Sequence, residues 1–250
     1  MPQDAANPYL TPAWVCAPGV LKIPFLKAFL PEYDLRRTPG GDVKAVLGWG
    51  MKPTAAAGRR WAAKTGRPYV ALEDGFLRSV GIGEAGATSL SLIVDDLGVY
   101  YDATRPSRLE RLIIEAETWC DAGVRARARG LIDRIVETGV SKTNMGGPLD
   151  PALLKPGRRV LIVDQTLGDA SIGYGLASTG SFAEMMRVAR RDEPGAQLIV
   201  KRHPAVAAGR KQGCITDLEG VTLIDADVRP ADLLAAVDAV YCVTSALGFE

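Results

Sequence analysis

Four clusters of polar residues in this sequence carry side chains that can bind and transfer a phosphorylated group. Each cluster follows a short run of apolar residues. In chain order they are Glu73-Asp74 with Arg78, Gln165 to Asp169 with Ser171, Lys201 to Pro204, and Thr244-Ser245 to Glu250. Carboxylates can act as nucleophiles or as acid–base catalysts, whereas basic side chains and hydroxyl groups can hold an anion. The chemistry to consider is therefore phosphate binding combined with carboxylate catalysis.

The third cluster places two basic side chains beside the one histidine of the chain. Lys201 and Arg202 can hold a phosphate through charge-assisted hydrogen bonds. His203 can neutralise or protonate a departing phosphate. The alternative is a surface loop in which Pro204 only ends the preceding strand.

Three further polar positions each allow two interpretations. Ser245 follows a strand-like run, where the N-terminus of a helix would attract phosphate, but it can equally be a plain helix cap. Asp169, with Ser171 nearby, fits either a catalytic carboxylate or a cap. The Asp95-Asp96 pair lies between two short strand-like runs, which favours a turn over a metal site.

The composition excludes several classes of protein. Thirty basic and 29 acidic residues leave a formal charge of +1, so nothing favours nucleic acid as a partner. Four scattered cysteines without a CxxC pair, and a single histidine, do not fit a zinc site and suit a reducing compartment. Prolines interrupt the first thirty residues, and no signal peptide or membrane span is predicted. We therefore expect a cytoplasmic protein.

Strand-like and helical stretches alternate along the chain, which is typical of an α/β fold with a parallel sheet. Predicted strands cover 43–47, 68–72, 90–94, 99–101, 159–164, 197–201, 221–224 and 239–243, and residues 95–98 are predicted to form a hairpin or a tight turn. Predicted helices cover 55–64, most of 106–137, 182–191 behind a Ser181/Glu184 capping box, and a stretch beginning at Pro230.

The segment 139–156 is rich in glycine and proline and is the predicted linker between two domains, 1–145 and 146–250. The polar clusters follow strands, so they should meet at the edge of the sheet where α/β proteins bind ligands. Because the chain stops at Glu250, shortly after a strand, we expect the second domain to be incomplete at its C-terminus.

The ordered set of motifs is similar to a known family. EDGFLRSVG, SLIVDD, YYDATRPS, DQT-GDASI, K-HP and TS-GFE appear in this order between about Gly48 and Glu250. Together they resemble the KpsC-type β-Kdo transferases of bacterial capsule assembly. Members usually carry two such modules in tandem and continue past GFE, whereas this chain has one module and ends there.

The resemblance implies two Rossmann-like domains facing each other across a cleft, as in GT-B glycosyltransferases. It implies transfer of Kdo from CMP-β-Kdo to a lipid-linked oligo-Kdo primer, the first domain being on the acceptor side and the second binding the nucleotide. Donor and product share an anomeric configuration, so the reaction is retaining and most simply uses a covalent glycosyl-enzyme intermediate. No metal or other cofactor is expected, because CMP carries one phosphate rather than the diphosphate that usually recruits Mg²⁺.

The same resemblance assigns roles to individual residues. Asp169 matches the nucleophile, and Glu73 matches the acid/base, with Asp74 as its rival. His203 and Ser245 would hold the CMP phosphate and Glu250 would reach the ribose. Contacts to the donor are also implied for Pro204, Thr244 and Ser171, and contacts to the Kdo carboxylate or hydroxyls for Lys201, Arg78 and Gln165.

Two other functions remain open at this point. One is a sialyltransferase-like enzyme that uses another CMP-sugar, against which the GDAS and TS-GFE motifs argue. The other is a non-catalytic module of a capsule assembly complex. For the Kdo transferase that the resemblance implies, the expected partners include other capsule assembly proteins at the inner membrane, where the chain would be peripheral.

Overall fold

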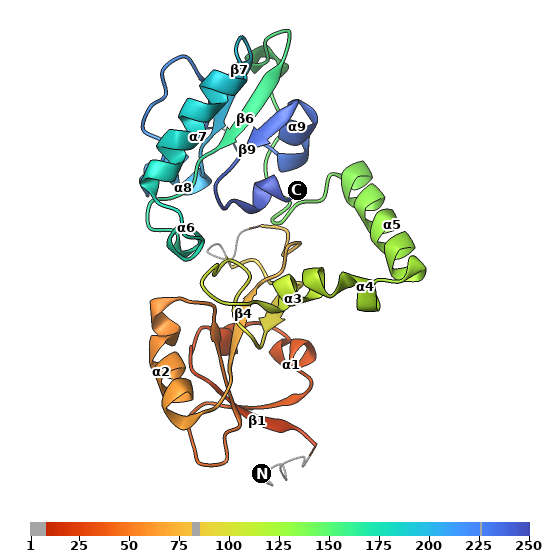
Figure 1. Ribbon diagram of the computed structural model, residues 1–250, viewed down its shortest axis with the longest axis vertical. Coiled ribbons are helices and arrows are strands. Elements are labelled where there is room, and N and C mark those ends of the chain that lie inside the picture. The colour runs from red at the N-terminus through yellow and green to blue at the C-terminus, as the bar shows by residue number, and fades with distance from the viewer. Residues whose placement is uncertain (1–8, 82–85, 226) are drawn as a thin grey trace. The chain divides into compact units, whose positions relative to one another are not determined.

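The computed structural model describes residues 9–81, 86–225 and 227–250. The chain divides into two compact units, residues 1–121 and 122–250, and each unit has its own sheet. The predicted mixed α/β class is thus confirmed, with the units dividing 24 residues before the expected boundary at 145/146 (145 − 121 = 24). Figure 1 labels the elements along the chain.

Unit 1 (residues 1–121) contains a five-stranded sheet in the order β2-β1-β3-β4-β5. The first four are parallel, and β5 runs antiparallel to β4. Their bounds are Thr11–Val15 (β1), Tyr33–Arg36 (β2), Ala45–Trp49 (β3), Tyr69–Asp74 (β4) and Leu92–Asp95 (β5). The apolar runs of β3 and β4 are buried, as expected for strands covered on both faces.

Helices α1 (Leu26–Phe29) and α2 (Ala56–Thr65) cover opposite faces of this sheet. On β3, Leu47 belongs to the core that contains Leu26 and Leu30. The preceding residue, Val46, lies on the other face beside Gly58 of α2. This alternation follows from the two-residue period of a strand, and it fixes which side chains of β4 point to which face.

The predicted hairpin around Asp95 is wrong in its second half. Asp95 Oδ1 accepts hydrogen bonds from the backbone N–H groups of Leu97 (3.0 Å) and Gly98 (2.9 Å), which makes the expected turn. Residues 99–101 then form a loop instead of a strand. The turn chemistry of Asp95 outweighs the strand preference of Val-Tyr-Tyr, and the loop carries Tyr101 to the site described below.

The long helical stretch predicted for 106–137 is three helices: α3 (Arg108–Ile114), α4 (Ala116–Trp119) and α5 (Ala122–Thr138). Ser107 and Glu110 form a capping box that starts α3. None of the three helices buries a residue.

Unit 2 (residues 122–250) contains a four-stranded parallel sheet in the order β8-β7-β6-β9. Its strands are Arg159–Val163 (β6), Gln197–Lys201 (β7), Thr222–Ile224 (β8) and Ala239–Tyr241 (β9). In chain order this is 3-2-1-4, which matches four adjacent strands of the 3-2-1-4-5-6 order of a nucleotide-binding Rossmann sheet. The direction of strand succession reverses between β6 and β9, and ligands bind at the carboxyl ends of strands beside such a switch point.

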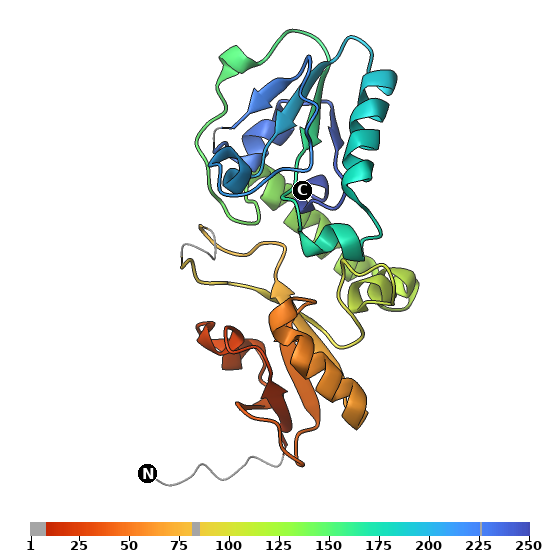
Figure 2. The ribbon, with the colours of Figure 1, turned by 90° about the vertical axis from the view of Figure 1, so that its left-hand side faces the viewer.

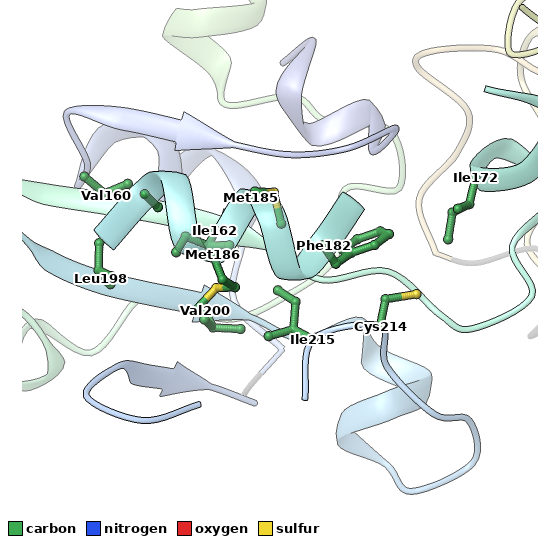
Figure 3. Packing of buried hydrophobic residues seen from close by; sticks show 11 residues of the cluster. Val160, Ile162, Ile172, Phe182, Met185, Met186, Leu198, Val200, Cys214 and Ile215 are labelled. Atoms are coloured by element: carbon green, nitrogen blue, oxygen red, sulfur yellow. The ribbon is translucent and has the colours of Figure 1, made fainter. Parts of the chain in front are cut away.

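Helices cover both faces of this second sheet (Figures 1 and 2). Phe182, Met185 and Met186 of α7 (Thr179–Asp192) belong to one core with β6 and β7, whose labelled side chains in Figure 3 are Val160, Ile162, Leu198 and Val200. Leu161, Val163 and Ile199 face the other way, toward a core that includes Leu233 of α9 (Pro230–Ala235). Full burial of one such side chain contributes about 1.5–3 kcal/mol, so the strand ends are firmly placed.

Two sequence predictions in unit 2 need correction. Helix α7 begins one turn before the predicted Ser181/Glu184 box, because Ser178 is the N-cap and forms the capping box with Ser181. Glu184 pairs with Arg187 on the exposed surface. The segment predicted as a linker is packed on unit 2: Gly147 pairs with Val228, and Leu149, Leu153 and Leu154 pack against the α9 side of the core.

Candidate functional site

The loops after β6 and β9 are tied together across the switch point of unit 2. Gln165 is buried, and its Nε2 donates to Thr244 Oγ1 (2.9 Å). In return, the backbone N–H of Thr244 donates to Gln165 Oε1 (3.0 Å). These contacts occupy both ends of the Gln165 amide, so Gln165 and Thr244 hold the two loops in register.

Asp169 lies on the turn after β6 and caps helix α6 (Ala170–Tyr174). Its Oδ1 accepts from the backbone N–H of Ser171 (2.9 Å) and from Ser171 Oγ (2.9 Å). Ser171 Oγ is also 2.9 Å from Thr244 Oγ1, which links the cap to the Gln165 contact. Both capping bonds go to one oxygen, Oδ1, so the cap does not use Oδ2, and the residue as a whole is exposed. The capping and catalytic interpretations of Asp169 are therefore compatible.

The predicted phosphate-binding residues line one pocket in unit 2. Lys201, His203, Pro204 and Ser245 all border a cavity of about 180 Å³. They come from the ends of β7 and β9, which lie on either side of β6. The structure thus brings together residues that are more than forty positions apart in the chain, at the edge of the sheet that the sequence predicts.

The two basic side chains that border this pocket, Lys201 and Arg202, differ in how far they are already paired with carboxylates. Both Arg202 nitrogens that face Asp225 pair with its carboxylate, so this guanidinium is largely neutralised. Burial lowers the pKa of Lys201, although Asp227 and Asp225 oppose this. Lys201 Nζ also donates to the backbone carbonyl of Arg202 (3.3 Å). Lys201 is therefore the better placed of the two cations for an anion in this pocket.

His203 caps the short helix α8 (Pro204–Ala207) through its ring. Nδ1 accepts the backbone N–H of Ala205 (3.1 Å). A neutral ring whose Nδ1 is an acceptor carries its proton on Nε2, which is then a donor. In this form the Nε2 proton lies on the opposite side of the ring from the capping contact at Nδ1.

Ser245 borders the pocket, whereas Glu250 lies outside its lining. Ser245 caps a single 3₁₀ turn (Ala246–Gly248) through a bond from Leu247 N–H (3.3 Å), where a full helix was expected. Glu250 Oε1 accepts the backbone N–H of Lys142 (3.0 Å).

In unit 1, the two rival carboxylates at the end of β4 have separate partners. Asp74 pairs with Arg78 Nε (2.6 Å), and the Arg78 side chain is only 11% exposed. The same guanidinium donates to Ser79 Oγ (2.7 Å) and to the carbonyl of Ala87 (3.2 Å). Glu73 accepts from the Tyr101 hydroxyl (2.8 Å). Since Asp74 is neutralised by an arginine, Glu73 is the better candidate for an acid/base.

Sequence reasoning missed two residues that shape these sites. Asp164, at the end of β6, is 3% exposed and accepts three backbone N–H groups, those of Gln165, Cys214 and Ile215. Its position directly after a buried strand was the available signal. Tyr101 lies in the YYDATRPS motif, but nothing in the sequence indicated its contact with Glu73, which spans 28 residues.

A larger cavity, of about 690 Å³, lies between α7 and residues 212–217. None of the predicted site residues borders it. The convergence of chemically matched groups therefore favours the smaller pocket at the strand ends.

Comparison with known proteins relates the chain to proteins of capsule polysaccharide biosynthesis. The family model described as "Capsule polysaccharide biosynthesis protein" matches residues 44–130 and 124–250. The capsule polysaccharide modification protein LipA of Neisseria meningitidis serogroup B is 44% identical over 245 residues, which are 95% of this chain and 34% of LipA. The lipopolysaccharide-processing protein LpsZ of Rhizobium meliloti is 39% identical over 212 residues, covering 83% of this chain and 48% of LpsZ. The chain spans about a third of the length of LipA.

Two solved structures from Thermosulfurimonas dismutans have the same fold. KpsC, beta Kdo 2,4 transferase, matches with a TM-score of 0.88 and 41% identity, covering 96% of this chain and 76% of that chain. KpsC, beta Kdo 2,7 transferase, matches with a TM-score of 0.65 and 23% identity, covering 95% and 74%.

Fold and site together define an α/β protein with a nucleotide-binding type of sheet and polar groups gathered at its switch point. More specifically, the chain belongs to the capsule polysaccharide biosynthesis protein family. Its predicted resemblance to KpsC-type proteins is confirmed by the 41% identical structure.

Proposed function

We propose that this chain is a catalytic module of a retaining β-Kdo transferase that takes Kdo from CMP-β-Kdo. The observation that carries the proposal is the pocket bordered by Lys201, His203 and Ser245 at the end of a sheet with nucleotide-binding order. The likeness to a beta Kdo 2,4 transferase that is 41% identical supports the choice of sugar.

The proposed donor site lies in unit 2. The Nε2 proton of His203 and the ammonium of Lys201 bind the single phosphate of CMP by charge-assisted hydrogen bonds, and Ser245 adds a hydroxyl. Placed there, His203 stabilises the phosphate as it leaves. These contacts are made by side chains, so no resident metal is part of the proposal.

The proposed reaction has two displacements. Asp169 attacks the anomeric carbon of Kdo, a carbon–oxygen bond to the carboxylate forms, and the bond to the CMP phosphate breaks. In the second step Glu73 removes the proton of an acceptor hydroxyl, whose oxygen bonds to the anomeric carbon while Asp169 departs. Two inversions retain the anomeric configuration. The mechanism requires Glu73 and Asp169 to reach the same sugar in the reacting complex, as they would in a GT-B arrangement of units 1 and 2.

The proposed acceptor is a lipid-linked oligo-Kdo chain, with the protein acting at the inner membrane beside other capsule assembly proteins. Across the part of the chain that the structure describes, no helix is both long and apolar enough to cross a membrane. Association with a membrane would thus be peripheral for these residues.

The decisive test is Asp169→Asn in the full natural protein, because asparagine caps a helix nearly as well as aspartate but is a poor nucleophile. We expect transfer to fall by several orders of magnitude while CMP binding and folding persist. Asp150→Asn is a matched control, since Asp150 also caps a short helix through one carboxylate oxygen and an N–H two residues on (2.9 Å). That control should leave transfer unchanged.

A second arm traps the intermediate. Glu73→Gln mixed with CMP-Kdo should gain the mass of one Kdo, and peptide mapping should place it on Asp169. An adduct on another residue, or an active Asp169→Asn protein, would overturn the mechanism. Binding of CMP without any turnover of CMP-Kdo would favour a non-catalytic module, and preferred turnover of CMP-sialic acid would identify a different transferase.

A further inference from the structure

The loop at 99–101, where a strand was expected, places Tyr101 beside Glu73, the candidate catalytic base. The hydroxyl of Tyr101 lies 2.8 Å from Glu73 Oε1, near the end of β4. Both side chains are partly buried. The contact joins residues 28 positions apart, so it depends on the loop that Asp95 and the following turn create.

The direction of this hydrogen bond follows from the chemistry of the two side chains. The backbone N–H of Met51 donates to the Tyr101 hydroxyl oxygen (3.0 Å). A phenol has one hydrogen, and a carboxylate can only accept, so the hydroxyl hydrogen points to Glu73. Burial and the neighbouring Glu73 carboxylate both raise the pKa of Tyr101, which keeps the phenol protonated as a donor.

The pair lies directly against the backbone of Gly50. Gly50 has a φ of +38°, and a Cβ at this position would lie 1.9 Å from Glu73 Oε1 and 2.4 Å from the Tyr101 hydroxyl. The carbonyl of Gly50 accepts hydrogen bonds from the Tyr69 hydroxyl (2.7 Å) and from Arg59 (3.3 Å). Glu73 Oε1 therefore lies between the backbone of Gly50 and the Tyr101 hydroxyl.

We propose that Tyr101 is a positioning residue that aims the Glu73 carboxylate and holds it in its ionised form, ready to accept a proton. This inference rests on the proposed role of Glu73 as the base of the second step. A donor to a carboxylate stabilises the charged form, whereas loss of that donor favours the protonated form. Tyr101 thus adjusts the pH at which Glu73 can act without touching either substrate.

The other ionisable groups near Glu73 are Tyr69 on β4, whose pKa Glu73 helps to raise, and Arg59 on α2 and Cys16 after β1, which also act on Tyr69. Tyr100 packs against Tyr101, and Asp74 pairs with Arg78. Tyr101→Phe changes none of these residues. A change seen on removal of the Tyr101 hydroxyl alone is therefore assigned to that hydroxyl.

The test is Tyr101→Phe, read by NMR titration of ¹³C-labelled glutamate side chains, with Glu73→Gln identifying the Glu73 signal. The pKa of Glu73 should rise by about 1, which corresponds to one charge-assisted hydrogen bond. The acidic limb of the rate–pH profile should move to higher pH by the same amount.

With CMP-Kdo, the Tyr101→Phe variant should accumulate the Kdo adduct, because only the second step is slowed. Tyr33→Phe, which removes a hydroxyl at the far edge of the same sheet, is the control and should change neither readout.

A conservative replacement keeps the test decisive if Tyr101→Phe fails to fold. Fluorotyrosine at position 101 keeps the hydroxyl and makes it a stronger donor, so the Glu73 pKa should fall and the acidic limb should move to lower pH. An unmoved Glu73 pKa in these variants would overturn the inference by itself. If Glu73→Gln retains full transfer, the proposed function of Glu73 fails instead, whatever the titration shows.

Discussion

Glu73 in unit 1 and Asp169 in unit 2 are both candidate catalytic carboxylates, but the chain holds them in different ways. Asp169 is fixed by Ser171, two residues further along, in an ordinary helix cap. Glu73 is fixed by Tyr101 from a distant loop and by close packing against Gly50. A local cap forms wherever the short sequence allows it, whereas the setting of Glu73 exists only when unit 1 is folded.

The difference fits the two chemical tasks. A nucleophile must meet the anomeric carbon directly, and Asp169 is exposed with one oxygen outside the cap. A base works best when its orientation and its pKa are both controlled, which local sequence alone cannot provide. We therefore expect substitutions around Glu73 to lower both activity and stability. Substitutions around Asp169 should lower activity with little loss of stability.

The largest expected effect on the free energy of unfolding is that of replacing Asp164, which lies in unit 2 but is not held by a local cap. Asp164, in unit 2, is held by tertiary contacts, since its Oδ1 binds the N–H groups of Cys214 (2.9 Å) and Ile215 (3.0 Å). Asp164→Ala should lower the free energy of unfolding by about 3 kcal/mol, because buried N–H groups lose their acceptor. Asp164→Asn keeps an acceptor and should cost clearly less in urea denaturation. Equal costs would mean that the hydrogen bonds are not what stabilises this loop.

Asp164 also makes the stability of unit 2 depend on pH, in a direction that its pKa shift determines. Burial raises its pKa above the ordinary value, against the three backbone bonds. Between the unfolded and the raised folded pKa the folded chain binds more protons, so stability falls as pH rises through that window and then levels off. Asp164→Asn should abolish this component, and an unchanged pH profile of stability would contradict the assignment.

The next effect tests close packing in unit 1. Gly50→Ala combines a positive φ with overlap against Glu73, and should cost about 2 kcal/mol or more in unfolding free energy, with loss of transfer. Gly66→Ala is the matched control, because Gly66 has a φ of +67° and a Cβ added there would meet nothing within 4 Å. The difference between the two variants isolates the packing against Glu73. Equal losses would show that backbone strain alone explains Gly50.

Much of the architecture could be predicted from local pattern. The strands at 159–163 and 197–201 are buried apolar runs bounded by charged or turn residues, and the structure confirms both. The predicted strand at 99–101 is absent because the Asp95 side chain accepts two backbone N–H groups, and the resulting turn ends the extended chain there. The α7 capping box was placed one turn late because serines occur at both 178 and 181 and either can begin the helix.

The site could be predicted only in part, because local patterns show where strands end but not which distant residues come into contact. Lys201, His203 and Ser245 follow strands, and parallel strands deliver their ends to one edge, where these residues border one pocket. The contacts of Tyr101 and Gly50 with Glu73 could not be foreseen, because each joins distant parts of unit 1. The pairing of Asp74 with Arg78 is local, since the two residues are four positions apart, and could have been inferred from the sequence. Local caps can be read from sequence, whereas tertiary contacts need the fold.

The smallest effect separates capping from ligand binding at His203, where the two are combined in one ring. Nδ1 caps α8 through Ala205 N–H, and the proposed phosphate contact uses Nε2. Asparagine can take over the cap, but its shorter side chain cannot place a donor where Nε2 lies. His203→Asn should therefore leave the unfolding free energy nearly unchanged and weaken CMP binding about tenfold, equal to about 1.4 kcal/mol, by calorimetry. His203→Ala should weaken CMP binding to the same extent and also lose about 1 kcal/mol of stability with the cap. If asparagine restores CMP affinity to that of the unaltered protein, His203 is only a cap, and the phosphate must be held by Lys201 and Ser245 without it.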